Sequence, residues 1–346
     1  MKPTRLAAVC LIFLTSPQSL VADTVKLRVA GSVSVTGNIQ AKREQPFFEA
    51  LAERTGLPLA VSYQPIDLLD MDPEEGLELV QHGIVDIASL GVAVISRRDP
   101  FFLGLDLVGL TPDYDDAKRV VSAFSEPIET HLRDSYNAKL LGIWPFGPQV
   151  LFCKPMISGL DEIEGLKVRV YDANLGAFIE TLGAIPVEIN FAEVRQALDL
   201  NIVDCAITGP SSANTAGWVD ETEVMMPLGF QIAFNAYAIN LDRWNTFTSD
   251  EQNALTAAFN DYLDDVWAYS EELFADALRC NVGDTPCSTV RSADLQLVPI
   301  EPADQNLLRN SLATISLPAW AASCERLHAG CHALWAGTVG KAMVID

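Results

Sequence analysis

Short apolar-rich runs alternate with segments of helical spacing near the start of the chain, and this pattern predicts strand, helix, strand, helix, strand. The first helical segment ends at Gly56, and the second begins after Asp72, a residue type that caps helices. The predicted strands are 25–31, 59–63 and 84–90, and the predicted helices are 45–55 and 73–82.

The same unit returns in the second half of the chain, where Asn190 and Glu193 have the spacing of a capping box. Its sequence also repeats, because 201–209 aligns with 83–91, and 166–170 aligns with 25–29 so that Arg169 matches Arg28. Units of this kind form parallel sheets with helices on both faces. We therefore expect two similar α/β lobes. The repeated strands are 166–171, 185–189 and 202–208, with helices at 175–182 and 190–201.

Residues 231–241 predict one more strand, and a helical pattern of about thirty residues starts near Ser249. Such a helix is roughly 45 Å long, longer than one small lobe, so we expect it to cross both. The alternative is two helices with a kink near Trp267. The expected lobe I is 23–146 plus about 232–264, and lobe II is 147–231 plus about 265–346.

Residues 1–22 resemble a secretory signal peptide, with Lys2 and Arg5 before a short apolar run. No later run is long enough to span a bilayer, so we expect a periplasmic protein. The formal net charge is −23, without the basic footprint that binding to nucleic acid or anionic lipid requires.

Beyond Cys10 the cysteines form an even set, which permits disulfides in an exported protein. Close spacing favours Cys280–Cys287 and Cys324–Cys331, with cross-pairing of the two clusters as an alternative. For Cys153 and Cys205, a third bridge and two buried thiols remain open. The residues Cys324, His328, Cys331 and His332 superficially resemble a zinc set, but the pattern favours a disulfide there, so we expect no metal.

The sequence contains no phosphate-binding, dinucleotide-binding or nucleophile-elbow motif, so we expect neither a cofactor nor catalysis. A cleft between the two lobes would receive the segments that follow the strands, namely 31–38, 89–91, 169–172 and 208–214. These segments offer hydroxyls, amides and one arginine, which is a binding surface without an evident nucleophile or base. An arginine inside an apolar strand needs a partner when buried, although it can also lie at a strand end with its head group in water.

Three motifs in order, 160–170, 182–187 and 193–204, resemble the signature of the substrate-binding proteins of tripartite ATP-independent periplasmic (TRAP) transporters. The resemblance covers essentially the whole mature chain. It implies a periplasmic binding protein fold in which two lobes, joined by crossing strands and a long bridging helix, close on a small organic acid. It also implies that Arg169 holds the ligand carboxylate, and that Gln149 and Thr208 supply polar contacts.

The chain departs from that family pattern at two places, because Gly147 or its neighbours occupy the site of a second arginine and Cys205 replaces a glycine. A monocarboxylate is therefore expected in preference to a dicarboxylate or a sialic acid. The aromatic candidates have core packing as an alternative. The complete candidate set is Arg169, Gln149, Thr208, Phe146, Trp144, Ser211, Asn214, Phe230, Asn235, Ser89 and Asn38.

The leading hypothesis is a monomeric binding protein that delivers a carboxylate to the membrane subunits of a TRAP transporter. A ligand-sensing module for a receptor is a second hypothesis, and an exported hydrolase or lyase is a third. Turnover of the bound compound distinguishes the third hypothesis from the others.

Overall fold

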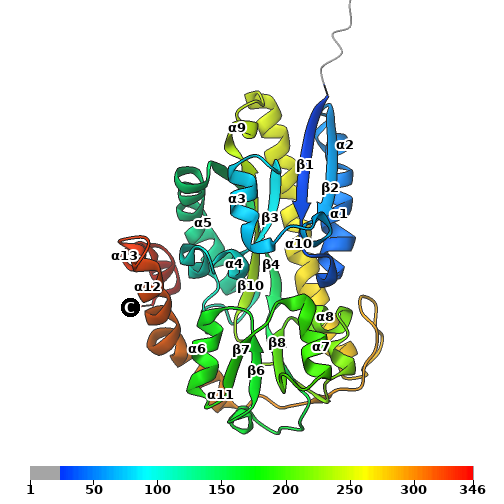
Figure 1. Ribbon diagram of the computed structural model, residues 1–346, viewed down its shortest axis with the longest axis vertical. Coiled ribbons are helices and arrows are strands. Elements are labelled where there is room, and N and C mark those ends of the chain that lie inside the picture. The colour runs from blue at the N-terminus through cyan, green and yellow to red at the C-terminus, as the bar shows by residue number, and fades with distance from the viewer. Residues whose placement is uncertain (1–23, 346) are drawn as a thin grey trace, which may run out of the picture.

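The computed structural model describes residues 24–345, and two sheets form the cores of two lobes (Figure 1). The expected signal peptide, 1–22, lies outside the described residues. The prediction of two α/β lobes is confirmed. Among the described helices, none is both long and apolar enough to cross a membrane.

The sheet of lobe I has five strands in the order β2-β1-β3-β10-β4. Strand β1 pairs in parallel with β2 and β3, whereas β10 runs antiparallel to both of its neighbours. Side chains of β10 alternate between two apolar clusters, so this sheet is buried on both faces. The strands are β1 (Val25–Gly31), β2 (Leu59–Pro65), β3 (Ile87–Gly91), β4 (Ala138–Pro148) and β10 (Ile232–Asn240).

The sheet of lobe II has six strands in the order β11-β9-β5-β8-β6-β7. Its parallel part, β7-β6-β8, repeats the order β2-β1-β3 of lobe I, as the sequence repeat predicts. The strands are β5 (Val150–Cys153), β6 (Lys167–Val170), β7 (Ile185–Glu188), β8 (Cys205–Thr208), β9 (Val224–Met226) and β11 (Gln296–Leu297).

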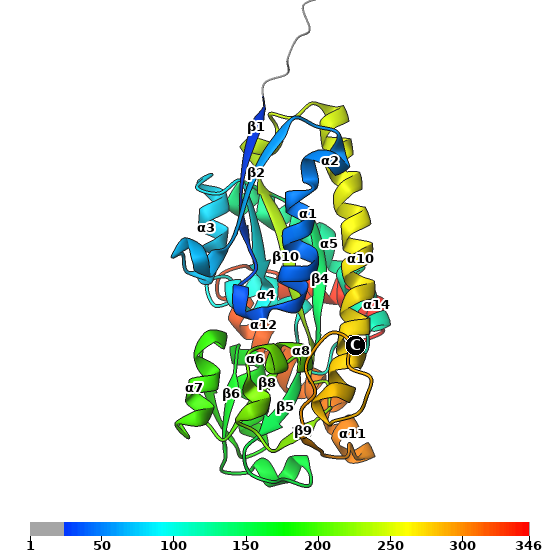
Figure 2. The same ribbon diagram turned by 90° about the vertical axis from the view of Figure 1, so that its right-hand side faces the viewer.

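Helices cover both sheets, and the longest, α10, runs along the side of both lobes (Figure 2). Its 33 residues make it about 50 Å long, and no break interrupts it at Trp267, so the alternative of two helices is wrong. The helices are α1 (Gln45–Glu49), α2 (Leu51–Thr55), α3 (Gly76–Gln81), α4 (Val92–Ile95), α5 (Tyr114–Tyr136), α6 (Ala173–Thr181), α7 (Val194–Asp199), α8 (Pro210–Thr215), α9 (Leu241–Trp244), α10 (Ser249–Asn281), α11 (Pro302–Ser311), α12 (Leu317–Glu325), α13 (Cys331–Trp335) and α14 (Lys341–Met343).

Two strand connections join the lobes, because β4 and β10 belong to one sheet whereas β5 and β9 belong to the other. Short peptide links such as 148–150 therefore carry the chain from lobe to lobe. This arrangement permits the lobes to move as rigid bodies about their links.

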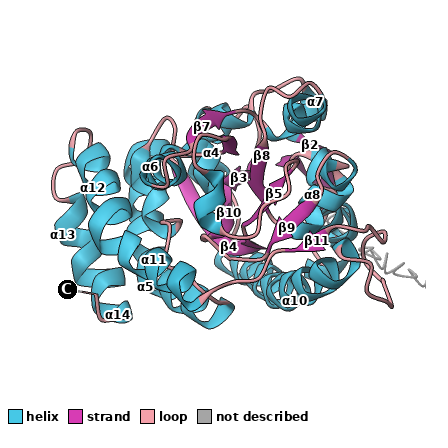
Figure 3. Cartoon of the chain, turned by 90° about the horizontal axis from the view of Figure 1, so that it is seen from below, coloured by secondary structure: helices cyan, strands magenta, loops and turns pink. Residues whose placement is uncertain are grey.

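The C-terminal helices do not lie in lobe II, where the expected boundaries place residues 265–346. The buried apolar side chains from Leu317 onward, like that of Leu312, join a core cluster of lobe I, whereas Ile315 still packs against a cluster of lobe II. The Trp320 indole donates a hydrogen bond of 2.7 Å to the carbonyl of Pro100, and the Trp335 indole donates one of 2.8 Å to that of Gly104. Helices α12, α13 and α14 consequently form a group beside α5 (Figure 3). The burial of two large indoles in lobe I thus decides the position of these helices, although the preceding part of the chain belongs to lobe II.

All six cysteines of the described region are paired. Cys280–Cys287 and Cys324–Cys331 form the two expected local bridges. The open question of the remaining pair is answered by a third bridge, Cys153–Cys205, which joins directly opposed residues of β5 and β8.

Candidate functional site

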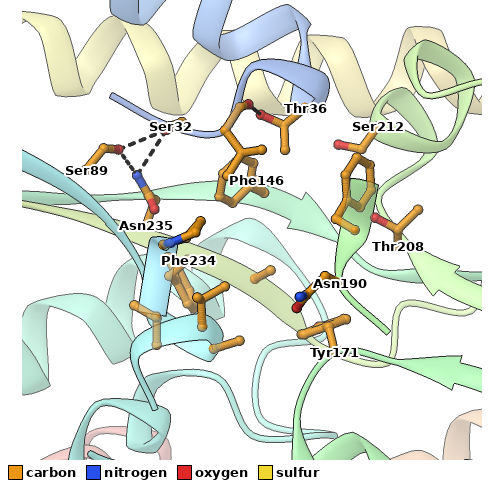
Figure 4. Close-up of a pocket in the computed structure, with 18 of the residues that line it drawn as sticks. Ser32, Thr36, Ser89, Phe146, Tyr171, Asn190, Thr208, Ser212, Phe234 and Asn235 are labelled. Atoms are coloured by element: carbon orange, nitrogen blue, oxygen red, sulfur yellow. Dashed lines mark hydrogen bonds between the residues drawn. The ribbon is translucent and has the colours of Figure 1, made fainter. Parts of the chain in front are cut away.

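A cavity of about 160 Å³ lies between the lobes, at the ends of their strands (Figure 4). Both lobes line it: Ser32 follows β1 and Ser89 lies on β3 in lobe I, and Arg169 and Thr208 lie on strands of lobe II. This is the edge where the carboxyl ends of parallel strands meet. No acidic, histidine or cysteine side chain lies among the lining residues, so the wall offers neither a general acid–base pair nor a set of metal ligands.

Arg169 is a buried cation, only 3% exposed, in the middle of β6. Its Nε donates to the carbonyl of Ile189 at 3.0 Å, and its Nη1 donates to that of Ile207 at 2.9 Å. Among the described residues, no carboxylate forms an ion pair with it. Burial lowers the pKa of the guanidinium to about 9, because the charged form has lost its water.

Aromatic rings surround this guanidinium and compensate part of its lost hydration. The Cζ atom lies 5.4 Å from the ring centroid of Trp218, 5.7 Å from that of Tyr171 and 6.0 Å from that of Phe191. Neutral rings and carbonyls provide no counter-charge. The site therefore carries a positive charge that a bound anion would neutralise.

A second arginine, Arg97, lines the cavity from lobe I and is absent from the predicted set. Its Nη1 pairs with the Glu74 carboxylate at 2.6 Å and donates to the Asn190 side chain at 3.1 Å. Its Nη2 donates to the carbonyl of Tyr171 at 3.2 Å. Because Glu74 neutralises this guanidinium, its main structural effect is to connect the lobes.

Asn190 shows why one sequence rule fails at this site. The expected capping box with Glu193 does not form, since the Asn190 side chain makes no capping hydrogen bond. It accepts instead from Arg97 and lines the cavity. A favourable local cap is thus replaced by a contact between lobes.

Opposite Arg169, on the lobe I side, three short polar side chains form a hydrogen-bonded triangle (Figure 4). Ser32 and Ser89 share a hydrogen bond of 2.8 Å, and the Asn235 amide donates to both hydroxyls. The backbone N–H of Ser32 donates to Glu44, whose carboxyl is fully buried, and burial raises the pKa of that carboxyl. The triangle offers neutral donors and acceptors.

The structure brings together part of the sequence-predicted set. Gln149 is held by a hydrogen bond of 2.7 Å from its Nε2 to the carbonyl of Gly147. Apolar walls separate the polar ends of the cavity and include Ile66, Val92 and Phe234. The predicted residues that line the cavity are Arg169, Gln149, Thr208, Phe146, Asn235 and Ser89.

The other predicted residues lie outside the cavity wall, and each has a structural role. Trp144 and Phe230 are fully buried in apolar clusters, which is the core-packing alternative for aromatic residues. The Asn214 amide donates to the Asn281 side chain at 2.7 Å. The Asn38 amide donates to the Ser211 hydroxyl at 3.2 Å, a contact that joins the lobes.

Other lining residues are absent from the predicted set. Some lie within the segments that are predicted to reach the cleft, because the strand pattern identifies such a segment but not which of its side chains face the cavity. Arg97, Asn190 and Phe191 lie outside these segments and become neighbours of Arg169 only through tertiary folding. The lining residues that the sequence prediction missed include Ser32, Ile66, Val92, Arg97, Tyr171, Asn190, Phe191, Phe234 and Ser212.

A pair of buried acids lies behind the cavity at the junction of the lobes. The Gln231 amide donates to Asp106 at 2.8 Å and to Asp172 at 3.2 Å. Burial and the neighbouring carboxyl raise the pKa of Asp106 well above its usual value. Burial raises the pKa of Asp172 to about 6, against hydrogen bonds from the first turn of α6.

Residues 31–304 match the family model described as bacterial extracellular solute-binding protein, family 7, also named DctP. The chain is 26% identical over 222 residues to the C4-dicarboxylate-binding periplasmic protein DctP of Rhodobacter capsulatus, an alignment that covers 63% of this chain and 66% of the relative. It is 24% identical over 208 residues to the sialic acid-binding periplasmic protein SiaP of Vibrio cholerae, with 59% and 63% covered. The chain thus spans slightly less than two thirds of each of these relatives.

Solved structures share the fold over nearly the whole chain. An extracytoplasmic solute receptor of Bordetella pertussis, which binds pyroglutamic acid, has a TM-score of 0.77 at 16% identity, with 93% of this chain and 100% of the receptor covered. A TRAP periplasmic solute-binding protein of Desulfovibrio salexigens with bound orotic acid has a TM-score of 0.79 at 18% identity, with 92% and 100% covered. The family match, over most of the chain, shows that this protein belongs to family 7 of the bacterial extracellular solute-binding proteins, the DctP family of TRAP substrate-binding proteins.

Proposed function

We propose that this protein captures a small organic acid with one carboxylate in the periplasm, as a monomer, and delivers it to the membrane subunits of a TRAP transporter. The observation that carries the proposal is Arg169, a buried guanidinium without an anionic partner among the described residues. A planar carboxylate would supply the missing charge and accept two parallel hydrogen bonds.

The charge balance of the cavity supports a monocarboxylate. Arg97 is already paired with Glu74, so Arg169 is the one cavity arginine whose charge is not balanced in the described structure. A second carboxylate on the ligand would lie among apolar walls and neutral polar groups, and burying it there would cost free energy.

The far end of the ligand would meet the Ser32, Ser89 and Asn235 triangle, which suits a hydroxyl, carbonyl or ring N–H. Ile66, Val92 and Phe234 would cover an apolar body between the two ends. Pyroglutamic and orotic acids, which similar structures bind, each combine one carboxylate with a ring carrying N–H and carbonyl groups.

A thermal-shift screen of organic acids tests the proposal, because a ligand specific for the folded state raises its melting temperature. Each acid is paired with its primary amide, which keeps the shape and removes the charge. We expect monocarboxylates to stabilise the protein and their amides not to do so. Equal shifts for acids and amides would contradict the proposal.

Mass spectrometry of the recovered compound distinguishes binding from catalysis. We expect the hit to return chemically unchanged after prolonged incubation with protein in excess, because the cavity wall has no acid–base pair. Conversion of the compound would favour the hydrolase or lyase hypothesis instead.

A further inference from the structure

Three side chains from distant parts of the sequence meet in lobe I, away from the lining residues of the cavity. Asp99 begins the 3-10 helix Pro100–Leu105, His131 lies on α5, and His328 lies in the loop between α12 and α13. Both histidines present Nε2 to the same carboxylate, His131 to Oδ2 at 2.6 Å and His328 to Oδ1 at 2.8 Å. These potential ligand atoms all lie within 4.8 Å of one another.

The carboxylate and one of the rings are fixed before any ion arrives. The backbone N–H of Phe101 donates to Oδ1 of Asp99 at 3.0 Å, and the Tyr136 hydroxyl donates to Oδ2 at 2.8 Å. The His131 ring stacks on Phe101, with centroids 4.2 Å apart. Hydrogen bonds of this kind orient the ligands of metal sites and tune their affinity.

We propose that Asp99, His131 and His328 bind a first-row divalent transition-metal ion such as Zn²⁺. Two imidazole nitrogens and a carboxylate are ligands that zinc accepts, with bonds of about 2.0–2.2 Å. Tetrahedral bonds of that length place neighbouring ligand atoms roughly 3.3–3.6 Å apart, so each histidine nitrogen has to move away from the carboxylate by about half an ångström or more. The His328 side chain is 30% exposed, so water completes the coordination from that side.

The proton balance is simple. A neutral histidine that donates through Nε2 moves its one proton to Nδ1 and coordinates through the freed nitrogen, so no proton is released. A protonated histidine releases one proton to solvent.

This site differs from the zinc set that the sequence suggests. Cys324 and Cys331 pair with each other, so their sulfurs are not available as thiolate ligands. Their bridge instead brackets the segment that carries His328, and the metal would join that segment to α5 and to Asp99. An ion here would fasten the C-terminal helices to lobe I, two residues from Arg97 along the chain.

The test uses the mature protein without a polyhistidine tag, stripped of metal with a chelator and then titrated with Zn²⁺ by calorimetry. We expect one ion per chain, with a dissociation constant in the micromolar range or tighter, and a melting temperature that rises with Zn²⁺. Ca²⁺ is the matched ion control, because it prefers oxygen ligands and would report only on the acidic surface.

Matched variants locate the ion. His328→Ala should weaken Zn²⁺ binding at least tenfold, whereas His332→Ala, in α13 and outside the cluster, should bind as the unmodified protein does. Tyr136→Phe, which removes a hydrogen bond to the carboxylate, should weaken binding by about 10- to 100-fold. Circular dichroism in chelator establishes that each variant is folded.

Two results would overturn the proposal. One is the absence of stoichiometric Zn²⁺ binding to the folded, unmodified protein, or an equal thermal shift with Ca²⁺. The other is Zn²⁺ binding that survives both His328→Ala and Tyr136→Phe unchanged. Should His328→Ala not fold, Tyr136→Phe alone decides, and unchanged affinity there would count against the site.

Discussion

Arg97 spans the cleft from lobe I to two groups of lobe II, the carbonyl of Tyr171 and the side chain of Asn190. Hydrogen bonds to a charged group contribute about 1.5–3 kcal/mol each. We therefore expect Arg97→Met to lower ligand affinity by about tenfold or more, mainly through faster dissociation, which stopped-flow measurements can follow. Arg98→Met is the matched control, because Arg98 pairs with Glu75 and Glu78 within lobe I. Equal dissociation rates for the two variants would contradict a role for Arg97 in closure.

Asp106 provides a residue-level prediction about pH. Its folded-state pKa is raised by burial and by Asp172, so the folded protein keeps a proton that the unfolded chain loses above about pH 4. The resulting contribution favours folding at acidic pH and is lost as the pH rises towards the folded pKa. Asp172 likewise favours folding at acidic pH, and its contribution is lost as the pH rises through its folded pKa of about 6, which burial and, to a smaller extent, Glu188 raise.

The variant Asp106→Asn cannot ionise and retains an oxygen for the Gln231 amide. We expect it to raise the free energy of unfolding more at pH 7.5 than at pH 4.5, as measured by urea unfolding at both values. A gain that is the same at both values, or larger at pH 4.5, would show that Asp106 does not keep its proton in the folded state.

Individual residues also show the limits of the sequence. The sequence repeat predicts that Arg28 and Arg169 are equivalent. In the structure, the backbone N–H of Asp86 donates to the carbonyl of Arg28, whereas the backbone N–H of the matching Asp204 donates to the carbonyl of Lys167. Arg169 therefore lies two residues, or about 7 Å, nearer the cleft than Arg28 does in its own lobe. Arg28 is instead half-exposed and paired with Asp86 at 3.0 Å.

At the scale of elements, the strands and their parallel order follow from the sequence because each strand–helix unit has a strong local pattern. Positive φ angles at Gly83 and Asn201, the aligned ends of two helical segments, show how closely the units repeat. The C-terminal helices were misplaced because their partners, such as Phe102, lie more than two hundred residues away. Arg97 lies 74 and 93 residues from Tyr171 and Asn190, and His328 lies 229 residues from Asp99, so no local pattern reveals either cluster.

The bridge Cys153–Cys205 gives an element-level prediction. It joins β5 to β8 across 52 residues, whereas Cys280–Cys287 spans only 7. A longer loop restricts the unfolded chain more, so we expect Cys153→Ala with Cys205→Ala to lower the free energy of unfolding by about 2–4 kcal/mol. The double variant Cys280→Ala, Cys287→Ala is the control and should lose less of its free energy of unfolding. Chemical unfolding under non-reducing conditions measures both losses. The reverse order would contradict this explanation.

At the scale of the whole molecule, contacts across the cleft indicate that the structure is a closed arrangement. The Asn38 amide donates to Ser211 and to Thr215 of lobe II, beside the contacts of Arg97. We expect the ligand-free protein to open about the links between the sheets, and a saturating ligand to reduce its radius of gyration in small-angle scattering. The same radius with and without ligand would argue against a hinge.

The central claim is that one buried guanidinium, on Arg169, holds the carboxylate of the ligand. Calorimetry with a confirmed ligand tests it through Arg169→Lys, which keeps the charge but removes the planar pair of donors. We predict a loss of about 2–5 kcal/mol, or roughly 30- to 4,000-fold in affinity. Arg28→Lys is the control, because Arg28 is exposed and already paired with Asp86, and this variant should bind the ligand nearly as the unmodified protein does. If folded Arg169→Lys loses less than about tenfold in affinity, the assignment of the carboxylate to this residue is wrong.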